Sequence, residues 1–468
     1  MFVWFSTFAE ETDSLRTCSE APFSHHFGYT LKVSPGKLIV MDEWQKKWQK
    51  NTKTIAFSIE ANYSALPQDK DDFAIDYNYP TLDFGLKFSL NDVTMHRATD
   101  EAWGMAKEVD YDSELGNIVT AYATFTRPIY RNNRWMFDYM LGTGIGYGKH
   151  KYSRGNNIDN ELTGSRFLIY FTGGLHATYR FADDWGMMAG VEFYHHSNGA
   201  LNRPNKGANV IGPVVGLRYM PYDKEFRSSR SSGVQGDSRS SGVQGSSRSS
   251  GVQGDSRSSG VQGNSRSSGV QGSSGVQEFS QSEATSSFTR FQKRFYANFT
   301  LGVGGKTLNE DWQLTQFRTP PDSPDYRTGR FRFYTAYSLQ TDVMYRYARR
   351  WASGIGADLF YGTYADRVRE IDNSKFKIQN SKVSPWSVGL ALKHQVYYHN
   401  LSVAMSIGYY LYRQMGSNAK EIEQPYYERI GVHYTIPSLR NLTVGFNVKA
   451  HRLKADLTEL VVSYPVDL

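Results

Sequence analysis

Large apolar residues alternate with small or polar residues along most of this chain. After Arg134, one set of alternate positions carries the large apolar side chains of Trp135, Phe137, Tyr139, Leu141, Ile145 and Tyr147. The positions between them carry Asp138, Gly142, Gly144, Gly146 and Gly148. Because successive side chains of a β-strand point to opposite faces, this period of two predicts a strand. Large apolar residues on one face and small or polar residues on the other are typical of a barrel wall that spans a membrane.

Sixteen segments show strand patterns of this kind. Eight lie in the first half, near residues 28–41, 54–66, 80–97, 116–129, 134–149, 166–181, 185–198 and 208–221. Eight more lie near residues 293–308, 331–346, 350–365, 384–398, 400–414, 426–437, 441–452 and 455–466. Eight antiparallel strands suffice to close a small barrel, and closure leaves no unpaired strand edge in the membrane. The sequence therefore predicts an all-β fold of two tandem eight-stranded antiparallel transmembrane β-barrels, and one sixteen-stranded barrel is the alternative.

The composition favours strands over helices as the membrane-crossing elements. Aromatic residues make up 15% of the chain, yet its mean hydropathy is only -0.54. The sequence has no run of about 18 apolar residues, which excludes a helical membrane protein. In a barrel wall, lipid-facing and inward-facing residues alternate and cancel in such an average.

A repeat separates the two sets of strands. Between about Arg227 and Gln277, the sequence Ser-Arg-Ser-Ser-Gly-Val-Gln-Gly-Asp recurs every nine residues with small variations. One valine per repeat buries too little apolar surface to offset the entropy of ordering the chain, so this tract is predicted to be a flexible linker. Much of the formal charge of +7 lies in this tract, so no nucleic-acid partner is predicted. The predicted division of the chain is an N-terminal segment at 1–24, interpreted as the remnant of a signal sequence, a barrel at 25–222, the linker at 223–285 and a second barrel at 286–468.

Three polar side chains interrupt an apolar strand face near residue 200. In the strand that begins at Trp185, the apolar face is set by Met187, Val191 and Phe193, and continuing in steps of two places His195 and Ser197 on it. In the next strand, the face set by Ile211, Val215 and Leu217 includes Asn209. His195, Ser197 and Asn209 are therefore expected to face lipid together. Such a polar cluster marks either the boundary of the membrane or a functional site.

The residues around this cluster form a recognisable motif. His195-x-Ser197-Asn198-Gly199, followed by Pro204-Asn205-x-Gly207, resembles the terminal hairpin of the outer-membrane lipid A 3-O-deacylases, which are also grouped as acyloxyacyl hydrolase-like barrels. The resemblance is strongest over residues 185–221 and extends by strand count back to about residue 28. It implies that Ser197 is the nucleophile, that His195 is its general base, and that Asn198 and the Gly199 amide donate to the oxyanion. No metal or other cofactor is implied.

The motif departs from the family at its third member. The family has a glutamate where this chain has Asn209. An amide oxygen can orient the histidine, but it cannot neutralise the imidazolium that forms during attack. In serine proteases, the corresponding change from carboxylate to amide lowers the rate about 10⁴-fold, through the wrong tautomer. The resemblance therefore predicts an ester hydrolase whose activity is reduced or absent, and the alternative is a barrel that keeps the motif without turnover.

The second half resembles the same barrel family more faintly. In its closing hairpin, Leu442, Val444 and Phe446 set the apolar face, so His451 and Glu459 are expected to face inward, and Leu453 stands where a nucleophilic serine would be. We interpret this half as a degenerate, non-catalytic copy.

The predicted function is that of a carboxylic ester hydrolase in the outer membrane of a Gram-negative bacterium. The resemblance implies that it removes an ester-linked acyl chain from lipid A, within lipopolysaccharide, or from a related glycolipid. Its expected partners are this substrate and the surrounding membrane lipids. The alternative is a non-enzymatic barrel that serves as a scaffold, an adhesin or a narrow channel.

Overall fold

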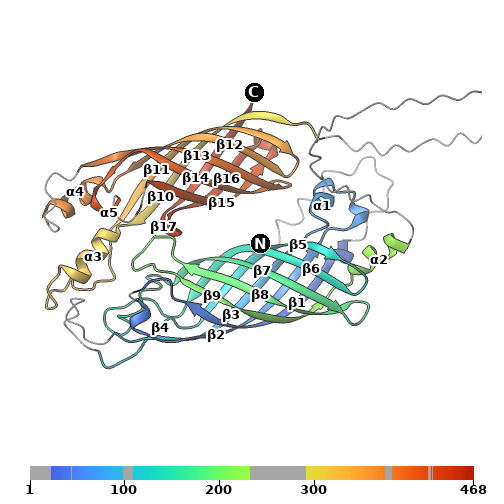
Figure 1. The fold of residues 1–468 in the computed structure, drawn as a ribbon, viewed down its shortest axis with the longest axis horizontal. Coiled ribbons are helices and arrows are strands. Elements are labelled where there is room, and N and C mark those ends of the chain that lie inside the picture. Colours follow the sequence, from blue (N-terminus) through green and yellow to red (C-terminus); the bar gives the residue numbers. More distant parts are fainter. Residues whose placement is uncertain are drawn as a thin grey trace, which may run out of the picture. The chain divides into compact units, whose positions relative to one another are not determined.

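The computed structural model describes residues 23–43, 45–97, 109–231, 291–374, 382–419, 423 and 425–468. The predicted signal remnant, up to residue 22, and the predicted linker from residue 232 onward lie outside the described residues. Two separate sets of antiparallel strands each close on themselves (Figure 1). This confirms the two tandem eight-stranded barrels and excludes the single sixteen-stranded barrel.

The first barrel consists of eight long strands. They are β1 (Phe27–Ile39), β2 (Gln49–Ser64), β3 (Thr81–Met95), β5 (Ile118–Arg131), β6 (Trp135–Gly148), β7 (Phe167–Arg180), β8 (Trp185–Ser197) and β9 (Ala208–Tyr219). Each strand pairs with the next long strand in the sequence, and β9 pairs with β1 to close the wall. A short strand, β4 (Ser113–Glu114), is added to the end of β3.

The second barrel also has eight strands, each paired with the next. They are β10 (Arg294–Thr307), β11 (Phe333–Ala348), β12 (Trp351–Gly362), β13 (Val383–Tyr398), β14 (Leu401–Met415), β15 (Tyr426–Ile436), β16 (Leu442–His451) and β17 (Lys454–Asp467). Pairing of β10 with β17 closes this barrel. All sixteen predicted strands are present, and most of their ends differ from the prediction by only a few residues.

Short helices connect some of the strands. The α-helices are α1 (Asp72–Asp76), α2 (Asp223–Ser231), α3 (Asn309–Phe317), α4 (Ala365–Ser374) and α5 (Gly416–Asn418). The 3₁₀ turns are Phe23–His26, Gln45–Lys47, Pro67–Asp69 and Pro437–Leu439. Helix α2 occupies residues 223–231, at the beginning of the segment that the sequence analysis assigned to the linker. Within the described part of the chain, no helix has the length and apolarity needed to cross a membrane.

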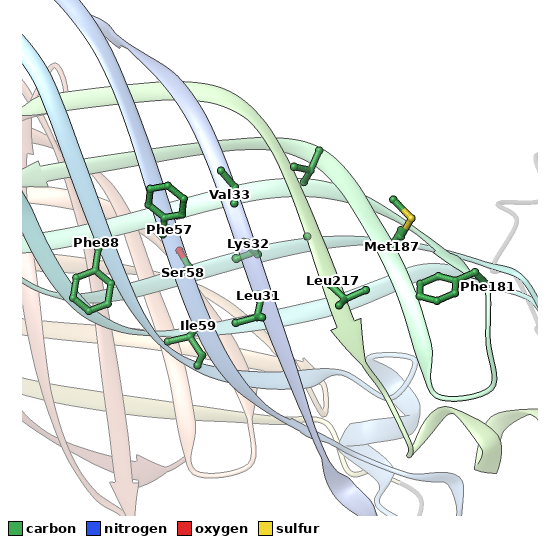
Figure 2. Close-up of a pocket in the computed structure, with 12 residues that line it drawn as sticks. Leu31, Lys32, Val33, Phe57, Ser58, Ile59, Phe88, Phe181, Met187 and Leu217 are labelled. Atoms are coloured by element: carbon green, nitrogen blue, oxygen red, sulfur yellow. The ribbon is translucent and has the colours of Figure 1, made fainter.

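The outer wall of the first barrel is apolar. Leu141, Ile145 and Leu175 are among its exposed side chains, and each has more than half of its surface exposed. A shallow apolar hollow crosses β1, β2 and β9, with Leu31, Phe57, Ile59 and Leu217 around it (Figure 2). Exposed apolar side chains along a whole wall are stable only against lipid tails, so this surface is the membrane-facing one.

The interior of the first barrel is filled with paired charges. Glu192 lies between two lysines, with Lys32 Nζ at 2.8 Å and Lys87 Nζ at 3.3 Å. Lys32 also contacts Glu60 at 2.6 Å, and each of these four residues is nearly inaccessible to solvent. Side chains therefore pack the interior, as expected of a barrel of eight strands.

Loop length differs between the two ends of the first barrel. Connections 149–166 and 198–207 lie at one end, where β8 ends and β9 begins, and so do the described parts of the connections from β1 to β2 and from β3 to β5. The opposite end has the tight turns 132–134 and 181–184, together with the longer connection 65–80. Outer-membrane barrels carry their longer loops on the extracellular side. The end at which β8 meets β9 is therefore the outer one.

Candidate active site

The hairpin of β8 and β9 brings His195 and Asn209 together. The two residues are register partners, and the next outward-facing pair below them is Phe193 and Ile211, whose side chains are exposed on the lipid-facing wall. Glu192 and His196 lie on the inward face and are each 1% exposed. The facing predicted from the period of two is confirmed for this hairpin.

A hydrogen bond orients the imidazole of His195. Its Nδ1 lies 2.8 Å from Oδ1 of Asn209. Because a carboxamide oxygen only accepts, Nδ1 carries the proton in this pair, which leaves Nε2 with a free lone pair. His195 is therefore held in the tautomer that can accept a proton from a serine hydroxyl.

Ser197 follows His195 by two positions at the end of β8. Its register partner is Ile169, an outward-facing residue of β7. Among the residues that the structure describes, no hydrogen bond joins Ser197 Oγ to His195. The hydrogen bonds of a catalytic pair are often long without substrate and shorten when substrate binds, so the placement on one face is the informative observation.

The loop after Ser197 is held by two asparagines. The backbone amide of Asn198 donates to Oδ1 of Asn205 at 2.9 Å, and Nδ2 of Asn198 lies 3.4 Å from the carbonyl oxygen of Pro204. Gly199 has a φ of +61°, and no acceptor for its amide is found within the described ranges. Of the two predicted oxyanion donors, the Gly199 amide thus has no hydrogen-bond acceptor within the described residues. Asn198 already forms hydrogen bonds that stabilise the loop.

Asn205 is a site residue that the sequence analysis did not single out. Since its Oδ1 accepts from the Asn198 amide, its Nδ2 hydrogens remain for another acceptor. The residue was part of the quoted motif, but nothing in the spacing indicated that its side chain returns to the start of the loop.

Gly207 packs directly against the imidazole. A Cβ atom at this position would lie 2.6 Å from Cε1 of His195, and φ is +76°, which disfavours any other residue. The Gly207 amide donates to the carbonyl oxygen of Leu162 at 3.0 Å, and the Lys206 amide donates to that of Glu161 at 3.1 Å. The loop 149–166 therefore fixes the turn that supports His195.

An ion-pair cluster reinforces this contact between loops. Glu161 accepts from Lys206 Nζ at 2.8 Å and from the guanidinium of Arg97, and Lys206 also contacts Asp42 at 3.1 Å. The Arg97 guanidinium lies 4.0 Å from the ring centre of Trp48. Burial alone would raise the pKa of Glu161, but Arg97 and Lys206 favour the carboxylate and lower this pKa to about 2. Sequence analysis missed this cluster because its members come from four separate loops.

Two nearby ionisable residues on β8 are not part of the site. His196 points inward, and its Nε2 lies 2.9 Å from Oγ1 of Thr120. Glu192 is the carboxylate nearest in sequence to His195, but it points into the interior and pairs with lysines there. It cannot take the place of the glutamate that Asn209 replaces.

The closing hairpin of the second barrel has a different arrangement. His451 is 4% exposed, and its Nε2 lies 3.0 Å from the hydroxyl of Tyr410. Glu459 is 1% exposed and accepts from Ser338, whereas Leu453 is 86% exposed at the turn. His451 and Glu459 therefore face inward as predicted, and no serine stands at the turn.

Ligand atoms of Glu423, His451 and Asp456 lie within 4.8 Å of one another, a spacing that a metal ion could bridge. However, Asp456 already contacts Lys306 and Lys449, and Glu423 contacts Arg413. With three cations around two carboxylates, the group is better described as a buried ion-pair network than as a metal site.

A closed barrel with an apolar wall and an ion-paired interior defines an outer-membrane β-barrel protein. Residues 30–218 match the family described as Lipid A 3-O-deacylase (PagL), and residues 295–467 match the family described as Acyloxyacyl hydrolase, C-terminal domain. The chain therefore belongs to the lipid A 3-O-deacylase and acyloxyacyl hydrolase family, an ester hydrolase family of the outer membrane. The first barrel carries the match to the lipid A 3-O-deacylase family, and the second barrel carries the match to the C-terminal-domain family.

Solved structures of single barrels are similar to parts of the chain. Neisserial surface protein A is 9% identical over 42% of this chain and 97% of its own, with a TM-score of 0.25. The outer membrane enzyme PagL is 12% identical over 41% of this chain and 98% of its own, also with a TM-score of 0.25. A search of curated protein sequences found no match.

Proposed function

We propose that the first barrel removes an ester-linked acyl chain from lipid A or a related glycolipid by a serine–histidine mechanism. The observation that carries this proposal is the 2.8 Å contact between His195 Nδ1 and Asn209 Oδ1, with Ser197 two positions away on the same lipid-facing strand face. A lipid in the outer leaflet can approach this face without leaving the membrane, and Ser197 itself is 5% exposed behind that face. An enzyme for a water-soluble ester would have no reason to place its nucleophile there.

The chemistry follows from the positions of these groups. Ser197 Oγ attacks the acyl carbonyl carbon while its proton passes to Nε2 of His195. The oxyanion accepts a hydrogen bond from the Gly199 amide, and the side-chain amides of Asn198 and Asn205 are further candidate donors. His195 then returns the proton to the sugar oxygen as the ester bond breaks. Water, deprotonated by His195, releases the free fatty acid and regenerates Ser197.

Asn209 limits how fast these steps can run. Its amide oxygen holds the imidazole in place, but it carries no charge to balance the imidazolium that forms during attack. The loss of charge balance raises the barrier, whereas the tautomer remains correct because Oδ1 accepts from Nδ1. We therefore propose a slow esterase rather than an inactive one.

The filled interior argues against the alternative of a narrow channel. Lys32, Glu60 and Glu192 are each less than 5% exposed and are joined by ion pairs of 2.6 and 2.8 Å across the interior. The second barrel has a comparable chain of contacts, in which Lys393 lies 2.6 Å from Asp342 and 2.8 Å from Asp358. We assign the second barrel a non-catalytic role, because it lacks a serine beside His451.

The test is mass spectrometry of lipid A from cells that carry the full chain in their outer membrane. Loss of the mass of one hydroxyacyl group is expected with the natural sequence and not with Ser197→Ala. Ser165→Ala is the matched control, because Ser165 Oγ donates to the carbonyl oxygen of Phe167 at the start of β7 and not to a residue of the proposed site. Unchanged lipid A from cells in which the protein is shown to be folded and inserted would contradict the proposal.

A further inference from the structure

Two lysines face each other on the lipid-facing wall close to the candidate active site. Lys37 of β1 and Lys53 of β2 are register partners, and both side chains are exposed. Lys37 is also the register partner of Ile211 on β9, which is the next outward-facing residue below Asn209. Neighbouring strands are about 4.8 Å apart, so Lys37 lies about 10 Å and Lys53 about 14 Å around the wall from β8.

Like charges directly opposite each other destabilise a strand pair. Within the described part of the chain, neither Nζ has an ion-pair or hydrogen-bond partner. Asp92 is the register partner of Lys53 on β3, but the recorded contact of its carboxylate is to Asn51. By contrast, the nearby Lys46 and Lys50 contact Glu43 at 2.6 Å and Asp112 at 2.8 Å. The Lys37–Lys53 pair thus places two positive charges beside one outward carboxylate, that of Asp92, and neither lysine forms an ion pair within the described residues.

The pair lies where the outer wall changes from apolar to polar. Below it, the outward positions are occupied by apolar residues such as Ile55, which is 37% exposed, and its register partner Leu90, which is 46% exposed. At this level of a membrane, the anions beside a protein wall are the headgroups of lipids whose acyl chains cover the apolar residues below. Asn209 and His195 lie at the same boundary. Asn209 is on β9, next to the strand of Lys37, and His195 is one strand further, on β8.

We propose that Lys37 and Lys53 bind a phosphate on the headgroup of the lipid whose ester lies at Ser197. This inference rests on the proposed function and adds two residues that would hold the headgroup of its substrate. Two ammonium groups can share a phosphate that carries up to two negative charges, which removes the repulsion between them. The phosphate contact would set the position of the sugar relative to Ser197, so the lysines determine specificity and take no part in the chemical steps.

Binding without turnover tests this site. Two proteins are compared: the full chain with Ser197→Ala, and the same chain that also carries Lys37→Gln and Lys53→Gln. The affinity of each is measured for lipid A and for dephosphorylated lipid A. About two favourable contacts are lost, so binding of the phosphorylated lipid is expected to weaken roughly tenfold or more at low salt. Binding of the dephosphorylated lipid is expected to stay the same. Equal loss for both lipids, or no loss for either, would overturn the proposal.

Lys46→Gln is the matched control, because it removes the same charge from the same end of the barrel but from a lysine paired with Glu43. It is expected to leave lipid binding unchanged, and an equal effect would show that only the overall charge matters. Inorganic phosphate at the same concentration as the lipid is expected not to compete with lipid binding. Full competition would show that Lys37 and Lys53 bind free anions instead of the lipid headgroup. The binding test uses Ser197→Ala and is therefore independent of turnover. If binding depends on the phosphate but the natural sequence does not hydrolyse lipid A, the lysine site is supported and the proposed function is contradicted.

Discussion

His195 and Asn209 occupy directly opposite positions on β8 and β9, with Nδ1 of the imidazole 2.8 Å from Oδ1 of the amide. The register of the hairpin creates this contact, and the amide oxygen fixes which imidazole nitrogen carries the proton. In the proposed site, a neutral residue thus supplies the contact that orients the histidine without the charge that a carboxylate would bring.

Replacing Asn209 with aspartate is therefore expected to increase turnover. Asn209→Asp keeps the size of the side chain and places a carboxylate oxygen near Nδ1, where it stabilises the imidazolium. The increase in kcat for lipid A hydrolysis is expected to be at least about tenfold, within the 10⁴-fold range that this kind of exchange spans in serine proteases. Asn209→Leu removes the acceptor and is expected to lower kcat. Equal rates in all three proteins would mean that this contact does not orient the base.

The turn at Gly207 is expected to tolerate no side chain. In Gly207→Ala, the new Cβ would lie 2.6 Å from Cε1 of His195, so the imidazole must move. A displacement of about 1 Å in a catalytic group lowers rates about 100-fold, and we expect a loss of that size in kcat. Gly155→Ala is the control, because a Cβ there meets nothing within 4 Å. Heat-modifiable migration on gels shows whether each variant has a folded barrel, and a fully active Gly207→Ala protein would contradict the proposed role of this turn.

Acid is expected to release the loop contact that holds this turn. The pKa of Glu161 is about 2 in the folded protein and near 4.5 in an unfolded chain, so its ion pairs stabilise the folded loop fully above pH 4.5. This contribution decreases as the pH falls from 4.5 toward 2, because protonation of the carboxyl then accompanies loop opening. Hydrogen-exchange protection factors of the Lys206 and Gly207 amides measure the change. Glu161→Gln is expected to show lower protection at pH 7 and little further loss in acid, and an identical acid profile in both proteins would contradict this assignment.

Removal of one interior carboxylate is expected to destabilise the first barrel. Glu192→Gln leaves Lys32 and Lys87 buried with less compensating charge. Breaking a buried ion pair by removing one partner costs about 3–5 kcal/mol, which we expect as a decrease in the free energy of unfolding in denaturant. Glu43→Gln is the control, because this side chain is 78% exposed, and we expect a change within about 0.5 kcal/mol. A small effect of Glu192→Gln would show that the interior charges contribute little to stability.

Substitution of His451 is expected to leave lipid A hydrolysis unchanged. This histidine bonds to Tyr410 inside the second barrel and has no serine beside it. His451→Asn should therefore retain kcat within about twofold, measured on the full chain. A large loss of activity with both barrels folded would identify a second catalytic centre.

The strands were predictable from the sequence because each is long and alternates on its own. The facing of the candidate site residues His195 and Asn209 was predictable for the same reason, since counting in steps of two places each on the lipid-facing side of its strand. Helices such as Asn309–Phe317 and Ala365–Ser374 were missed, because a helix of two or three turns in a connecting loop leaves only a weak periodic pattern. The contact between Glu161 and Lys206 was also missed, because it joins two loops and no local pattern reports such a contact.

The placement of Ser197 and His195 on the outside of the wall determines how a lipid encounters them. A lipid arrives by moving sideways within its own leaflet, and water molecules arrive from the solvent side of the same rim. The encounter rate therefore depends on the mole fraction of the lipid in the membrane and not on its concentration in the bulk solution. Diluting lipid A with an inert lipid at constant total amount should slow the reaction, whereas adding more vesicles of the same composition should not change the rate per protein.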